Sequence, residues 1–237
     1  MKSLKFSLLL LISISILSSC ETNEYEEPEF NGIGDVFVRC SKVGDETHYA
    51  PAFHAFANEN LSEVLVESPV AEIPNYELSD YTVDKRWFRL LPETADYSTT
   101  DIANGIYKFE LVSVGQETIR VQDKLLDSRI EAMEITDFTY KKEGHTFTIL
   151  WNELDNADTY VVELMTEKDG KVLYISDRIA ATEYEFNENS KNWNYGVQLA
   201  VGTTYWVGVF AYEFESATAN NGSDINSETV EYREIVW

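Results

Sequence analysis

The chain has few cysteines, few basic residues, and no stretch after residue 20 that keeps a helical period for three turns. Its 237 residues include two cysteines, and 18 Lys and Arg residues stand against 42 Asp and Glu residues, for a formal net charge of −24. The negative electrostatic field of such a chain repels nucleic acid and anionic lipid head groups, which excludes both as binding partners. A G-x-S-x-G elbow, a Gly-rich phosphate loop and an H-E-x-x-H motif are also missing, which excludes the enzymes that depend on them.

The first twenty residues have the pattern of an export signal. Lys2 and Lys5 give a cationic start, and residues 6–17 are apolar apart from three serines. This run is too short to remain as a membrane span, so residues 1–19 are predicted to be a signal peptide. The sequence Leu17-Ser18-Ser19-Cys20 resembles the lipobox of bacterial lipoproteins. That resemblance implies cleavage before Cys20 and a lipid, such as palmitate, on its thiol, which would anchor the protein to a membrane.

An acidic tether follows the predicted lipid site. Residues 21–30 read ETNEYEEPEF and carry five glutamates. Such a segment cannot bury apolar area and its charges repel one another, so residues 20–30 are expected to be extended and solvated. The segment also resembles the acidic tag that sends some lipoproteins to the outer face of Gram-negative cells. This favours an outer-membrane location with exposure at the cell surface, the alternative being the inner leaflet facing the periplasm.

The remaining chain is predicted to be globular and entirely β. Its composition, 44% hydrophobic with 13% aromatic residues, provides material for a core. The length after the tether suits two domains of roughly 100 residues each, which we place at residues 31–127 and 128–237. In the first of these, short alternating stretches predict an antiparallel sandwich of immunoglobulin type. These stretches are Val36 to Cys40, Tyr49 to Phe56, Val64 to Val66, Trp87 to Leu91, Gly105 to Leu111, and Ile119 to Val121.

The second part resembles a fibronectin type III domain. The landmarks are Trp151 at the end of one alternating run, Tyr160 at the start of the next, and Leu199 to Tyr205 leading into a long apolar run. The resemblance implies a second β-sandwich with Trp151 in its core. From the residues themselves, Tyr205 is expected to bury its ring while its hydroxyl bonds nearby backbone, as in a tyrosine corner.

No catalytic or metal-binding constellation is found. His48, His54 and His145 are dispersed, without a cysteine or paired carboxylate at ligand spacing. With Cys20 lipidated, Cys40 cannot form an intrachain disulfide and is expected to be a small core residue. The loop Asn220 to Glu228 offers oxygen ligands for Ca²⁺ but lacks regular spacing, so a polar hairpin loop is favoured. No cofactor and no metal site are therefore predicted.

One group of aromatic residues is not explained by packing in the core of its own sandwich. If the odd-numbered residues of the run 205–212 face inward, period two places Trp206, Phe210 and Tyr212 on the opposite face. Trp193 and Tyr195 lie in a neighbouring Asn-containing segment. These five residues form a candidate binding face. It is open to three interpretations: packing against the other domain, a surface for a protein partner, or a glycan-binding platform.

Taken together, these patterns predict a lipid-anchored surface protein that binds or scaffolds and does not catalyse. Its partners would be the membrane, through the N-terminal lipid, and either a protein or a glycan. The alternative function is an accessory glycan-binding lipoprotein of a polysaccharide-uptake system. A fold alone does not assign function, so the ligand stays open at this point.

Replacing Cys20 with Ala should abolish lipid attachment, because the acylated thiol is lost. The variant should be recovered as an unprocessed or soluble form, checked by labelled-palmitate incorporation and cell fractionation. A Cys20→Ala chain that stays membrane-bound and still incorporates palmitate would contradict the lipobox interpretation. As a separate arm, exchanging the tether glutamates for Gln should reduce protease access to the protein on intact cells.

Overall fold

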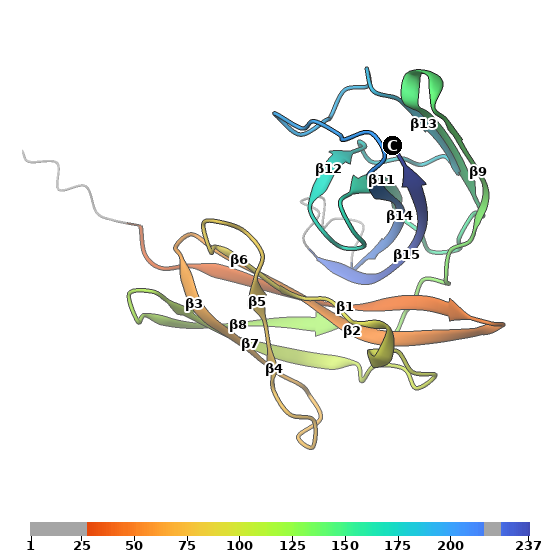
Figure 1. Cartoon of the computed structure of the whole chain (residues 1–237). Coiled ribbons are helices and arrows are strands. Elements are labelled where there is room, and N and C mark those ends of the chain that lie inside the picture. The colour runs from red at the N-terminus through yellow and green to blue at the C-terminus, as the bar shows by residue number, and fades with distance from the viewer. Residues whose placement is uncertain (1–27, 216–223) are drawn as a thin grey trace, which may run out of the picture.

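The protein is built from β-strands and two single-turn 3-10 helices, as seen in a computed structural model that describes residues 28–215 and 224–237 (Figure 1). The predicted all-β class is confirmed. The predicted signal peptide, Cys20 and the tether up to residue 27 lie outside the described residues. Within the described ranges, no helix has the length and apolar character needed to cross a membrane.

Eight strands form the first half of the structure. Six of them coincide with the alternating stretches predicted from the sequence, whereas β4 and β5 are two-residue strands in a segment expected to be a connection. The strands are β1 (Gly32–Val43), β2 (Glu46–Ala57), β3 (Leu61–Glu67), β4 (Tyr76–Glu77), β5 (Ser79–Asp80), β6 (Trp87–Leu90), β7 (Gly105–Ser113) and β8 (Thr118–Leu125), with the 3-10 turn η1 (Thr94–Asp96) after β6.

These strands form an immunoglobulin-like sandwich. The order β1-β2-β6-β5 makes one layer and β4-β3-β7-β8 makes the other, which matches the ABED and CFG layers of that architecture with one added strand. Val36, Val38 and Phe53 from the first layer are fully buried with Phe109 from the second. A Cβ on Gly34 would lie 2.4 Å from the Phe109 ring, so glycine at this position lets β7 pack closely against β1.

Seven strands form the second half. The predicted strands at residues 147–151 and 160–164 and the long run to residue 212 are all present. The elements are β9 (Ile135–Lys141), the turn η2 (Glu143–His145), β10 (Thr146–Trp151), β11 (Thr159–Met165), β12 (Val172–Ile175), β13 (Glu183–Phe186), β14 (Thr204–Phe214) and β15 (Ile225–Val236).

A second sandwich results, with β13-β10-β9 facing β12-β11-β14-β15. Trp151 is 3% exposed, and it lies in the core with Phe147 and Val209, as expected. The tyrosine corner is also confirmed, because Tyr205 is buried and its hydroxyl accepts a hydrogen bond of 3.0 Å from the Ala200 amide.

The two sandwiches share one sheet. Strands β15 and β1 pair in parallel through Val38, Arg39 and Cys40, so that β12-β11-β14-β15-β1-β2-β6-β5 is a continuous eight-stranded sheet (Figure 1). The predicted boundary between residues 127 and 128 falls in the connection from β8 to β9. Since backbone hydrogen bonds cross between the halves, their separation into independent domains stays a prediction.

Replacing Trp151 with Ala should lower the free energy of unfolding of the full chain by about 3–5 kcal/mol, because a large buried ring leaves a cavity. Urea denaturation followed by circular dichroism measures this loss. Trp87→Ala is the comparison: that residue is 39% exposed, so its loss should cost clearly less than the loss of Trp151. Equal losses in the two variants would show that Trp151 does not carry the core of its sandwich.

Candidate functional site

The candidate site is the junction, which we define as the β1–β15 pairing together with the side chains of Arg39, Asp169 and Glu228. Arg39 and Glu228 stand opposite each other in the parallel register, so their side chains lie on the same face. Arg39 is 3% exposed, and its Nε donates a hydrogen bond of 2.6 Å to Glu228 Oε1. Its two terminal nitrogens donate to the Asp169 carboxylate at 2.7 and 3.0 Å. The guanidinium is thus fully paired by two carboxylates, one of them bidentate.

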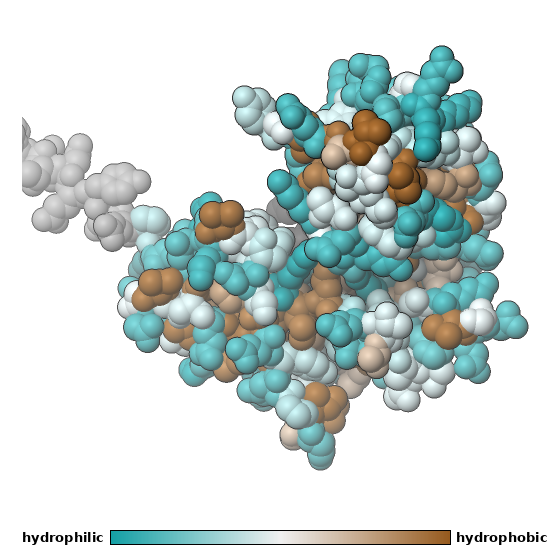
Figure 2. Space-filling view, in the orientation of Figure 1, coloured by the Kyte–Doolittle hydropathy of each residue, from teal (hydrophilic) through white to brown (hydrophobic). Residues whose placement is uncertain are grey.

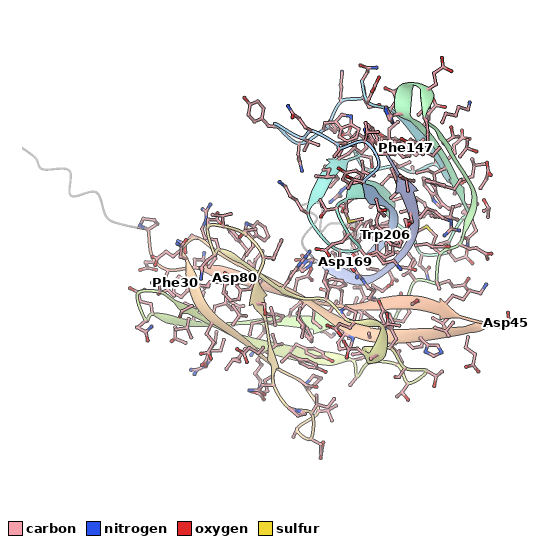
Figure 3. The ribbon with its side chains drawn as sticks, in the orientation of Figure 1. Phe30, Asp45, Asp80, Phe147, Asp169 and Trp206 are labelled. Carbon is pink, nitrogen blue, oxygen red and sulfur yellow. The ribbon has the colours of Figure 1, made fainter. Side chains whose placement is uncertain are left out.

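Asp169 reaches Arg39 because it is at the tip of the hairpin between β11 and β12. The chain turns at Asp169 with a φ of +56°, and a Cβ on Gly170 would lie 2.3 Å from Glu167 Cγ, so a larger residue there would require the Glu167 side chain to move. Figure 3 shows Asp169 between the second half and strands β1 and β2. Its carboxylate also accepts the Tyr232 hydroxyl at 2.7 Å, and its carbonyl accepts Arg89 Nη2 at 2.5 Å.

The junction has strong electrostatic coupling. Burial alone would raise the pKa of the Asp169 carboxyl, but the charge and hydrogen bonds of Arg39, together with the Tyr232 hydroxyl and Arg89, hold that pKa below its usual value. Burial raises the pKa of Glu228 in spite of the opposing effect of Arg39. On the neighbouring β11, burial and then the charges of Glu228 and Asp169 raise the pKa of Glu163 to about 7. Three carboxyl groups, those of Asp169, Glu228 and Glu163, therefore lie near Arg39, more than its single positive charge can neutralise.

An apolar cluster reinforces the junction beside the ion pairs. Phe37 and Ala52 of the first half are fully buried against Ile225 of the second. Tyr212 and Phe214, on β14, pack onto the same cluster. The halves therefore meet through a small core as well as through charges.

Side chains of β15 also hold the connection between β8 and β9. Ser227 Oγ and Thr229 Oγ1 accept hydrogen bonds from backbone amides of this connection at 2.8 and 3.1 Å. Asn226 accepts the Leu126 amide at 2.9 Å and donates to the Ser128 carbonyl at 2.7 Å. Because this polar run is buried and bonded to the connection, the segment between the halves is fixed along its length.

The structure divides the five predicted face residues among three environments. Phe210 is buried and Tyr212 belongs to the junction cluster, with their rings stacked at 6.2 Å. Trp206 is on the same face of β14, where the Lys168 ammonium is 4.7 Å from its ring. Trp193 packs against the second core and its indole nitrogen donates to the Asn187 carbonyl at 3.1 Å. Tyr195 alone is fully exposed, at 106% of its reference area.

The remaining polar candidates have structural surroundings. Cys40 is 1% exposed and burial raises its pKa to about 12, so it is a core residue as predicted. Burial, with the charges of Arg89 and Arg39, lowers the pKa of His54 to about 4. Of the loop considered for Ca²⁺, residues 220–223 lie outside the described residues, and Glu228 is engaged by Arg39. In the described part of the chain, no group of three or more His, Cys, Asp or Glu side chains is placed to hold a metal ion.

Sequence reasoning did not identify the junction. Two signals for it are present in the sequence. Arg39 interrupts an otherwise apolar alternating strand, and the polar run Asn226 to Thr229 leads into an apolar alternating stretch. The prediction of a hairpin loop up to Glu228 was wrong for residues 225–228, which belong to β15. A charged residue in a core strand requires a buried partner, but neither signal identifies that partner.

Comparison with known proteins gives structural likenesses of low score. No model of a protein family matches the chain, and no curated protein matches it in sequence. Three solved structures each cover 86% of the chain at 10% identity. They are the CD2-binding domain of CD58 (92% of that chain covered, TM-score 0.23), a tetra-tandem repeat of the extending region of a large adhesion protein (49%, 0.25), and a DUF4785 family protein from Legionella pneumophila subsp. pneumophila strain Philadelphia 1 (56%, 0.24). At these scores no function is transferred, and the immunoglobulin-like assignment depends on the strand order described above.

Replacing Glu163 with Gln should make stability less dependent on pH. The folded pKa of Glu163, about 7, lies above the ordinary value of 4.5, so the folded state favours the protonated acid. Wild-type stability should therefore fall as pH rises from 4.5 to about 7 and stay reduced above that. The variant should match wild type near pH 4 and exceed it at pH 8 by about 1–3 kcal/mol in urea denaturation.

Glu63→Gln is the matched control, because Glu63 is exposed on β3 and its removal should leave the pH profile of wild type unchanged. An identical pH profile for Glu163→Gln and wild type would contradict the coupling of Glu163 to the junction.

Proposed function

We propose that the protein is a non-catalytic binding or scaffold module, held at the outer surface of the cell by lipid on Cys20. The observation that supports this most is the junction. A continuous sheet, a buried ion network and an apolar cluster join the two sandwiches, which suits a protein that holds surfaces at a fixed distance and angle. In the junction, Arg39 binds the carboxylates of Glu228 and Asp169, and burial raises the pKa of Glu163, so these groups serve the contact between the halves.

The second half of the module is proposed to be fibronectin type III-like, spanning residues 128–237. The support is the strand order, with three strands facing four, and the core positions of Trp151 and Tyr205. The first half, residues 31–127, is the immunoglobulin-like partner. Modules of both kinds commonly act as spacers and interaction surfaces, which agrees with the proposed role.

The lipid-anchored surface location is proposed from the N-terminal sequence. Phe30, which is buried, lies two residues before β1, so the acidic tether would connect the lipid to the central sheet. The chain's net charge of −24 would keep such a protein soluble above a membrane of the same sign.

Rigidity of the junction is testable by backbone ¹⁵N relaxation. Both halves of the wild-type protein should tumble with one rotational correlation time, because the junction fixes their relative orientation. In Arg39→Met/Asp169→Asn/Glu228→Leu, the cation and both of its carboxylate partners are removed together, so no charge of this network is left unpaired and the fold should persist. Amides at the β1–β15 pairing should then exchange with solvent at least tenfold faster. Two different correlation times in wild type would overturn the rigid-scaffold proposal.

Surface display is tested separately with an antibody against the second half. Intact cells that express the wild-type chain should be labelled, and cells that express Cys20→Ala should not. Labelling that appears only after permeabilisation would place the protein on an inner face.

A further inference from the structure

A groove with a cavity volume of about 370 Å³ opens between β12 and the segment that connects β13 to β14. In Figure 1 this segment is on the side of the second half that points away from the first half. Leu173 and Tyr205, both buried, form its apolar floor. The polar residues at its rim include Lys171, Asn194 and Gln198, and the exposed Tyr195 lies beside them.

Tyr195 has no structural role that explains its exposure. Its side chain is fully exposed, and Gly196 follows it with a φ of +76° and no atom within 4 Å of a Cβ built there. Single exposed hydrophobic residues are common on protein surfaces, so exposure alone does not assign a role to Tyr195. Its position beside a groove is what matters, because a solvent-exposed ring there is free to stack on a ligand. On the face drawn in Figure 2, hydrophobic residues lie in patches among hydrophilic ones.

The polar groups around the groove argue against a peptide that adds as a strand. β12 is at the edge of the sheet, but the carbonyls of Leu173 and Val172 already accept hydrogen bonds from the Asn194 amide and side chain, at 2.9 and 2.7 Å. The Ile175 amide donates to the Asn192 carbonyl at 3.5 Å. An incoming strand therefore finds the β12 backbone occupied, and recognition must come from side chains.

Charge further restricts the ligand. The lining residues include one cation, Lys171, and no carboxylate, so the groove cannot hold a divalent metal through carboxylates. The net charge of −24 on the whole chain disfavours anionic ligands. An aromatic face, neutral amides that pair with hydroxyl groups, and an apolar floor are the features that a neutral carbohydrate requires.

We propose that this groove binds one or two rings of a neutral saccharide, with one sugar face stacked on Tyr195 and the amides of Asn194 and Gln198 bonded to its hydroxyls. The volume is within the range of small-ligand sites. This inference rests on the proposed binding function and names the chemical class of one ligand.

The test is a glycan array probed with the full chain in a non-glycosidic detergent, followed by titration calorimetry with the best neutral oligosaccharide. The array holds neutral oligomers of glucose, mannose, galactose and xylose, with uronic-acid and sialylated glycans as charged counterparts. We expect binding to at least one neutral oligomer and none to the charged set. Tyr195→Ala should weaken binding at least tenfold, and Gln198→Ala should weaken it several-fold.

Two variants serve as controls. Tyr195→Phe keeps the stacking ring and should bind within about threefold of wild type. Val201→Ala removes a side chain that is 89% exposed and does not line the groove, so its binding should equal that of wild type. Because Tyr195 is fully exposed, all variants should unfold at the wild-type temperature.

The proposal is overturned if no neutral glycan binds, if only charged glycans bind, or if Tyr195→Ala binds as wild type does. These results would leave the proposed scaffold function standing, because junction rigidity and surface display are measured independently of sugar binding.

Discussion

The burial of the Arg39 guanidinium is the interaction on which the arrangement of the two sandwiches depends. Removing such a cation from water costs several kcal/mol unless its hydrogen bonds are completed. Its partners, Glu228 and Asp169, come from the other half of the chain, so the cation is satisfied only when both halves are folded and correctly placed. We interpret the network as a device that specifies one orientation, since a buried ion pair contributes less to net stability than apolar groups of similar volume.

Strand β15 has three roles that explain its unusual composition. It closes the four-stranded layer of the second sandwich, pairs in parallel with β1, and bonds the connection between β8 and β9. A purely apolar strand could fulfil the first two roles through its backbone. The buried polar run Asn226 to Thr229 supplies the side chains that bond the connection and the carboxylate that pairs with Arg39.

Local pattern was sufficient to predict most of the strands, the core position of Cys40 and the tyrosine corner, because these features depend on alternation and on hydrogen bonds between nearby residues. The core position of Trp151 followed from the resemblance to fibronectin type III domains. The parallel pairing of β1 with β15 was not predictable in the same way. It joins residues far apart in the chain, and the sequence of neither strand indicates which other strand it pairs with. The aromatic face was only partly informative, because period two places Tyr212 on the outer face but does not say that the other half covers it.

The parallel pairing also determines how the protein would respond to tension. A pull on the residues before β1, with the second half held fixed, acts along the strand axis, in the plane of the central sheet. The hydrogen bonds between β1 and its two neighbours are then loaded in shear, so they share the force and must break together rather than one after another. Added to this ladder, the Arg39 pairs would make the attachment between the halves resistant to a pulling force along the strands.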